Sequence, residues 1–190
     1  MIKTVVRTAA SLASAIALLG SANAAVEVVI TESGGGVTAT YSGSIDLTGL
    51  AEFGSDTQDR AQIGPVSGFV ISIPNADVTF WRVPDPWTPF GTGGGVSTGS
   101  ASGDAFALFT DPALGLPTGY VSGSALSGMV TFAGETFASL GISLGVFTSD
   151  LGNGDSVSVI VGDAAPVPVP AAALLFAPAA LAFARRRKAA

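Results

Sequence analysis

From Ala25 onward, apolar and polar residues alternate with a period of two, and this alternation constrains the fold more than any other feature. Successive side chains of a strand point to opposite faces of a sheet, so the alternation predicts half-buried strands. Gly, Ser and Pro separate the alternating runs and predict tight turns between them. The predicted strands cover residues 26–32, 37–41, 44–50, 69–73, 78–83, 105–109, 120–122, 129–132, 142–147 and 157–161.

The segments between these runs receive different predictions. Residues 51–62 hold acidic side chains without periodicity and predict an exposed loop, and residues 74–77 predict a turn. Residues 84–90 combine three prolines with aromatics, and a Gly/Ser/Thr-rich run follows to Gly103. Because proline cannot donate to a ladder, this stretch is predicted as loop or sheet edge. Residues 135–140 fit either one helical turn or another strand.

The spacing of the predicted strands is typical of an antiparallel β-sandwich of about nine or ten strands. The domain predicted over residues 25–163 has about 140 residues, enough to bury roughly two-thirds of its unfolded surface around one core. Cysteine and histidine are both absent from the chain. No disulfide can therefore support the core, and Ser-His, Cys-His and imidazole- or thiolate-based zinc sites are excluded. No cofactor is predicted.

Charge is sharply segregated along the chain. All 14 acidic residues lie between Glu27 and Asp163, where Arg60 and Arg82 are the only basic residues. Neutralising phosphates requires clustered Lys or Arg, so this acidic stretch argues against nucleic acid as a partner. A solvated extracellular surface fits the composition better.

Residues 1–24 have the layout of a secretory signal peptide. Lys3 and Arg7 form a positive beginning, an apolar run follows, and Ala22 and Ala24 supply the small residues of a cleavage site. The segment predicts engagement with the secretory translocon and signal peptidase. The alternative is an N-terminal membrane anchor that is retained.

Residues 164–190 have the layout of a sorting and anchoring tail. A proline-spaced motif leads into 14 apolar residues between Pro170 and Arg185, about 21 Å as a helix against roughly 30 Å of hydrocarbon. Counted from Val167, the run is long enough to span a membrane. The terminal cations predict a cytoplasmic stop by the positive-inside rule. The motif consists of Val167, Pro168, Val169, Pro170 and Ala171, and the stop of Arg185, Arg186, Arg187 and Lys188.

This tail resembles the PEP-CTERM class of bacterial sorting signals, most closely its VPLPA variant, with Val169 in place of leucine. The resemblance implies recognition by an exosortase, a membrane protease that would cleave near the Val-Pro motif in a Gram-negative, exopolysaccharide-producing bacterium. Residues 30–34, 42–50 and 116–124 also resemble small β-rich exported proteins with such tails, which have no assigned activity. The implied route is export across the inner membrane, transient anchoring by the C-terminal helix, and release to the cell envelope, surface or matrix. An ordinary C-terminal membrane anchor is the alternative.

Three kinds of candidate site lie in the predicted β domain. Carboxylate pairs that could serve hydrolysis are Asp56 with Asp59, Asp104 with Asp111, and Asp150 with Asp155. Asp150, Asn153 and Asp155 offer oxygen ligands for calcium, although Asn153-Gly154 is also a strong hairpin turn. Trp81, Trp87 and Phe90 could form an aromatic platform for sugar rings, or could instead be buried.

Three functions follow from these features. The leading prediction is a non-enzymatic surface or matrix protein with a structural or adhesive role, linked to exopolysaccharide or biofilm. The alternatives are a carbohydrate-binding module, with exopolysaccharide as its partner, and a carboxylate-dependent hydrolase. Exposed tryptophans would favour the second, and a cleft with two facing carboxylates the third.

Overall fold

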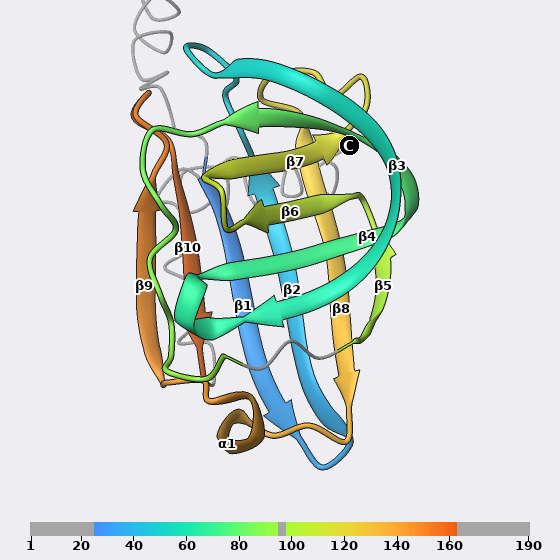
Figure 1. The fold of residues 1–190 in the computed structure, drawn as a ribbon, viewed down its shortest axis with the longest axis vertical. Coiled ribbons are helices and arrows are strands. Elements are labelled where there is room, and N and C mark those ends of the chain that lie inside the picture. The colour runs from blue at the N-terminus through green and yellow to red at the C-terminus, as the bar shows by residue number, and fades with distance from the viewer. Residues whose placement is uncertain (1–24, 95–97, 163–190) are drawn as a thin grey trace, which may run out of the picture.

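The computed structural model describes residues 25–94 and 98–162, which form two β-sheets (Figure 1). The predicted all-β class is confirmed. The only helices within these residues are the single turns η1 (Pro65–Ser67) and α1 (Phe137–Leu140). The strands are β1 (Ala25–Ser33), β2 (Gly36–Ser44), β3 (Ala51–Gly64), β4 (Phe69–Arg82), β5 (Ser100–Gly103), β6 (Phe106–Phe109), β7 (Ala113–Pro117), β8 (Ala125–Ala133), β9 (Gly145–Asp150) and β10 (Ser156–Val161).

The larger sheet has six strands in the order β5-β8-β2-β1-β10-β9. Alternate residues of β1 and β10 are buried, as period-two patterning requires. The predicted purely antiparallel arrangement is wrong at the centre of this sheet, where β1 and β10 run parallel, with Ala25 opposite Ser156 and Ile30 opposite Val161. No hairpin fixes the relative direction of these two strands, because the whole smaller sheet lies between them in the chain.

The smaller sheet has the order β3-β4-β6-β7, with a further pairing between β4 and β7. Strand β4 bends, so that its first half pairs with β6 and its second half with β7. Asn75 lies in the bend with φ of 46°, the one described non-glycine residue with positive φ. The predicted turn at residues 74–77 is therefore a bend inside one long strand.

The predicted exposed loop at residues 51–62 is also wrong, because β3 pairs with β4 along both halves of the bend. Most β3 side chains are exposed as far as Arg60, and burial begins only at Ala61. Neither face of β3 is buried before Ala61, so this part of its sequence carries no apolar alternation.

The remaining differences are local. The segments predicted as strands at 44–50 and 120–122 are loops, apart from Ser44, which ends β2, and Ile45 in the first loop is fully buried. Strand β7 was not predicted, strand β5 lies in the Gly/Ser/Thr-rich run, and the strand predicted at 142–147 begins at Gly145. The segment at 135–140 forms one helical turn, capped by the Thr136 side chain.

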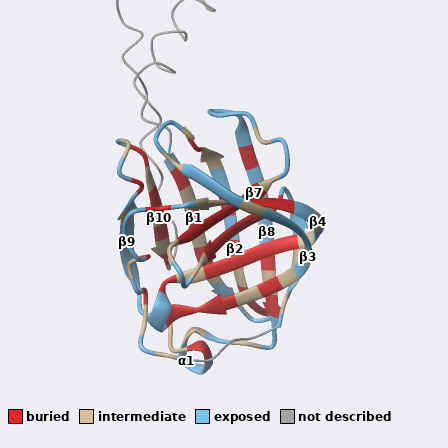
Figure 2. Ribbon diagram, turned by 45° about the horizontal axis from the view of Figure 1, so that its top comes forward, coloured by how far each residue is buried: buried red, intermediate tan, exposed pale blue. Residues whose placement is uncertain are grey.

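The two sheets pack over a shared core, and their strands cross at a steep angle, as in orthogonally packed sheets (Figure 1). Figure 2 shows buried segments on strands of both sheets. The largest fully buried side chains, Phe90, Phe106 and Phe132, come from a loop, β6 and β8. A second, smaller cluster of Ile71, Ile73, Val78, Ala105 and Ala107 forms around the bend of β4, with Phe69, Ala76, Phe80 and Phe109 packed against it.

The chain enters and leaves the larger sheet at opposite ends. Ala25 begins β1 beside the start of β10, whereas Val161 ends β10 beside Ile30. No helix within the described residues is long and apolar enough to cross a membrane. The predicted signal peptide with Ala22 and Ala24, and the tail with its motif at residues 167–171 and its basic stop at residues 185–188, lie outside the described residues.

Candidate functional site

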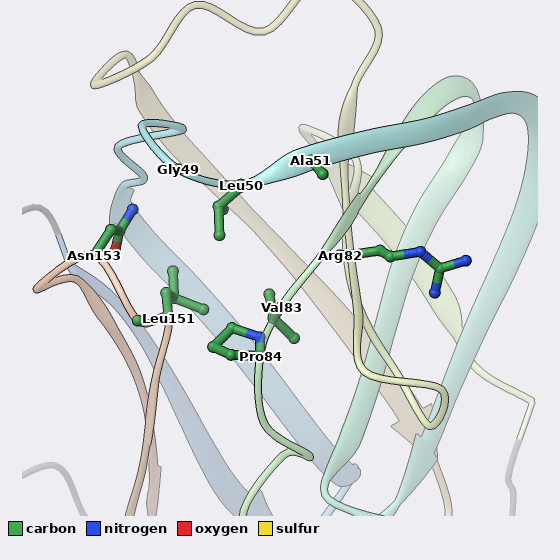
Figure 3. Close-up of a pocket in the computed structure, with 9 residues that line it drawn as sticks. Gly49, Leu50, Ala51, Arg82, Val83, Pro84, Leu151 and Asn153 are labelled. Carbon is green, nitrogen blue, oxygen red and sulfur yellow. The ribbon is translucent and has the colours of Figure 1, made fainter.

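A groove of about 330 Å³ opens where the β9–β10 hairpin meets the ends of the smaller sheet (Figure 3). Leu50, Val83, Pro84 and Leu151 form an apolar floor, and their side chains turn toward one another. The Arg82 side chain extends away from this floor. Among the described residues that line the groove, none carries a carboxylate.

A polar network fastens the hairpin turn beside this groove to the loop at residues 45–50. The Asn153 Nδ2 amide donates to the carbonyl oxygens of Asp46, at 2.7 Å, and Thr48, at 3.1 Å. The buried carboxylate of Asp155 accepts the Asp46 backbone N–H at 2.6 Å, and Asn153 Oδ1 accepts the Asp155 N–H at 3.0 Å. The three bonds between the turn and the loop join segments more than 100 residues apart in the chain.

Asp46 and Tyr120 complete the network on the outer side. The Asp46 carboxylate accepts the backbone N–H and the hydroxyl of Thr48 and the Ser122 hydroxyl, at 2.7–2.9 Å. These hydrogen bonds, above all the backbone one, lower the pKa of Asp46. The Tyr120 hydroxyl accepts from Ile45 N at 2.9 Å and donates to the Ser124 carbonyl at 2.6 Å. Burial is the main cause that raises the pKa of Tyr120, and the Asp155 charge adds to it.

The three predicted calcium ligands take part in internal hydrogen bonding. Asp150 Oδ1 accepts the Gly152 N–H at 2.6 Å, and Asn153 and Asp155 are engaged as described above. The Asn-Gly segment forms the predicted hairpin turn between β9 and β10. Among the described residues, no group of three or more His, Cys, Asp or Glu could hold a metal ion.

The predicted carboxylate pairs separate into different environments. Asp104 accepts a hydrogen bond from the Ser127 N–H at 2.8 Å, whereas Asp111 is exposed in a turn. Asp155 is buried, whereas Asp150 is exposed. Asp56 lines an open hollow of about 290 Å³ with Asp77, a partner that the sequence did not suggest, rather than with Asp59. Thr57 donates to both carboxylates, from its N–H to Asp56 at 2.8 Å and from its hydroxyl to Asp77 at 2.5 Å.

The three predicted sugar-contacting rings do not form a surface platform. Trp87 is 3% exposed and donates its Nε1–H to the Phe109 carbonyl at 2.8 Å, and Phe90 is fully buried. Trp81 is half-buried and packs against the main core, where its Nε1 has no hydrogen-bond partner. The proline-rich loop is drawn inward because Thr88 bonds to β9 through Thr148 and Ser149.

A different aromatic surface connects β3, β4 and β6. Phe53 lies 6.0 Å from Phe80, and Phe80 lies 5.5 Å from Phe109, between ring centroids. The Arg82 guanidinium lies 4.4 Å from the Phe53 ring and that of Arg60 lies 5.6 Å from the Phe109 ring. We call this row, Arg82–Phe53–Phe80–Phe109–Arg60, the aromatic–arginine strip. In the sequence, only the isolation of Arg60 and Arg82 among acidic residues pointed to this strip. The three rings come from separate strands, so no local pattern predicts that they meet.

The described residues thus define a small all-β domain of two packed sheets, with an apolar groove, a hydrogen-bonded loop network and one aromatic strip. Searches against protein-family models, curated proteins and solved structures found no match to this chain.

Proposed function

We propose that this protein is an exported, non-enzymatic domain with a structural or adhesive role at the cell surface or in the extracellular matrix. The observation that carries the proposal is that polar side chains near the groove form hydrogen bonds to other parts of the chain. The carboxylates and amides of the groove end are engaged in hydrogen bonds that fasten loops together. Such bonds stabilise a scaffold, whereas an acid–base catalyst needs a carboxyl group that is available to substrate.

The route we propose is delivery by the two terminal segments. The signal peptide would direct export, and the Val-Pro motif, apolar run and basic end would direct processing by an exosortase-type enzyme. The strand directions support a defined orientation on a membrane anchor. Because Val161 leaves the sheet at the end opposite Ala25, a C-terminal anchor would leave the groove and the loops at 45–50 and 151–155 facing away from the membrane.

This route is tested by expressing the full chain in an exosortase-containing Gram-negative bacterium and measuring its surface accessibility and C-terminal processing. A Pro168→Ala, Pro170→Ala double variant should accumulate with its tail uncleaved. The matched control is Pro84→Ala with Pro86→Ala, which removes two prolines of the same spacing from exposed positions. The control should be processed like the wild type. Retention of the wild type inside the cell, or normal processing of the motif variant, would contradict the proposal.

The non-enzymatic role is tested separately. The carboxylates that share a hollow, Asp56 and Asp77, are the pair best placed for hydrolysis. We expect the purified protein to leave glycan substrates uncleaved, with no difference between the wild type and an Asp56→Asn, Asp77→Asn variant. Glycan cleavage that this double variant abolishes would establish the hydrolase alternative.

A further inference from the structure

We propose that the aromatic–arginine strip is a binding site for a polysaccharide whose carboxylates are separated by neutral sugar units. The inference deepens the adhesive role proposed above and relies on it for display outside the cell. Binding is measured on purified protein. A failure to bind would therefore not contradict the proposed delivery route, and a failure of delivery would not contradict the binding result.

The strip is continuous and is accessible at the end near the groove. Each member lies within 4.4–6.0 Å of the next, measured between ring centroids or from a guanidinium carbon to a centroid. Phe53 is 43% exposed and Arg82 is exposed, whereas Phe80, Phe109 and Arg60 are half-buried. Arg82 also lines the groove of about 330 Å³, while its guanidinium extends away from the apolar floor toward the strip.

Packing within the domain explains only part of this arrangement. Phe80 and Phe109 cover the small cluster around the bend of β4, which accounts for their position. Phe53 belongs to neither core cluster and keeps much of its surface in water. An exposed aromatic ring held beneath a guanidinium offers stacking area and charge to a ligand at little ordering cost, because the neighbouring side chains already fix its position.

The charges of the strip define the chemistry of its ligand. Fourteen acidic residues lie between Glu27 and Asp163, yet within the described residues neither arginine forms an ion pair. Arg60 donates to the Gln62 amide oxygen at 2.7 Å, and both guanidinium groups stack on phenylalanine. A guanidinium that retains free donors can bind a carboxylate through two parallel hydrogen bonds.

The order of groups favours a carboxylated sugar polymer over other anions. Two cations flank three uncharged rings, so a matching ligand carries its charges apart and presents apolar ring faces between them. Pyranose rings have such faces, and a uronic acid adds a carboxylate at the edge. A densely charged polyanion such as nucleic acid would need more cations than the strip has and would be repelled by the acidic domain.

The test is calorimetric titration of the full-length protein, in a non-ionic and sugar-free detergent, with partly methyl-esterified polygalacturonate, in which neutral esterified units separate the carboxylates and which is called polygalacturonate below. Parallel titrations use its fully methyl-esterified form, neutral dextran and single-stranded DNA. We expect polygalacturonate to bind and the methyl ester, which keeps the ring faces and loses the charge, to bind at least about tenfold more weakly. Dextran and DNA should bind no better than the ester.

Variants assign the binding to the strip. Phe53→Ala and Arg82→Gln should each weaken polygalacturonate binding by about tenfold or more, and Arg82→Lys should recover part of the loss because it keeps the charge without the planar fork. Val121→Ala, at an apolar side chain that is 68% exposed and lies in a loop outside the strip, is the matched control and should bind like the wild type. Thermal unfolding of every variant separates lost binding from lost folding.

Three results would overturn the inference. The first is an absence of polygalacturonate binding by the wild type, and the second is unchanged binding by folded Phe53→Ala and Arg82→Gln variants. The third is equal affinity for polygalacturonate and DNA, which would indicate attraction of any polyanion.

Discussion

Tyr41 is the residue that most directly ties the two sheets together. It lies on β2 of the larger sheet, and its ring stacks on Phe106 of the smaller sheet at 4.9 Å between centroids. Its hydroxyl donates to the Asp104 carbonyl and lies 3.3 Å from Ser72 Oγ, which in turn donates to the Met129 carbonyl at 3.1 Å. Gly128 opposite leaves the necessary space, since a Cβ there would lie 2.1 Å from the phenolic oxygen.

Replacing Tyr41 with phenylalanine should therefore lower the free energy of unfolding by about 1–3 kcal/mol, because buried hydrogen-bonding groups lose a partner. Urea unfolding measures the change. Thr40→Ala, at the neighbouring exposed position, should shift the free energy by less than about 0.5 kcal/mol. Equal effects of the two substitutions would show that the hydroxyl does not connect the sheets.

The two tyrosines also make stability sensitive to alkali. Tyr41 and Tyr120 are the only tyrosines, and burial is the main cause that raises the pKa of each above 10.0. The raised folded pKa favours the protonated form, so this stability is present below pH 10 and is lost as pH rises through the folded pKa. Absorbance titration should show both phenols ionising later in the folded protein than in guanidinium chloride, and coincident titrations would contradict this account.

At the scale of elements, the bend of β4 gives the smaller sheet its shape. Asn75 adopts φ of 46°, a region in which asparagine is tolerated and β-branched residues are strained. Asn75→Val should lower the free energy of unfolding by about 1–2 kcal/mol, whereas Asn75→Gly should change it by less than about 1 kcal/mol. Chemical denaturation measures both. Ser55→Val, at an exposed position of β3, is the control for adding valine, and an equal loss in that variant would rule out strain at the bend.

The β9–β10 hairpin supplies a second element-scale prediction. Asn153→Ala removes the amide bonds to the Asp46 and Thr48 carbonyls and should lower the free energy of unfolding by about 1–2 kcal/mol. Because Asp150, Asn153 and Asp155 each already accept a hydrogen bond through one side-chain oxygen, millimolar calcium should leave the melting temperature of the wild type unchanged. A calcium-dependent rise that Asn153→Ala abolishes would instead make the turn a metal site.

These elements show what the sequence could predict. Strands β1, β2 and β10 follow from alternation because one of their faces is buried and the other is not. Strand β3 was not predicted because most of its side chains are exposed. The segment at 44–50 resembled a strand because Ile45 is buried although it lies in an irregular part of the chain. The pairing of Asp56 with Asp77 and the aromatic–arginine strip depend on strand register, which local patterns do not encode.

At the scale of the whole molecule, the strand directions bear on the proposed delivery and anchoring of the domain. Its strands run from Ala25 to Val161, so the described fold lies between the predicted signal peptide and the predicted tail. Because the first and last strands lie side by side in parallel, the two ends of the domain face opposite directions. We therefore expect removal of the signal peptide to free one end while the tail holds the other.

The most direct test of this account is the intact mass of the protein recovered from the surface or medium of the organism that produces it. We predict a mature form that begins at Ala25 and lacks the basic end at residues 185–188. Recovery of the whole chain of 190 residues from inside the cell, with both ends uncut, would contradict the central claim.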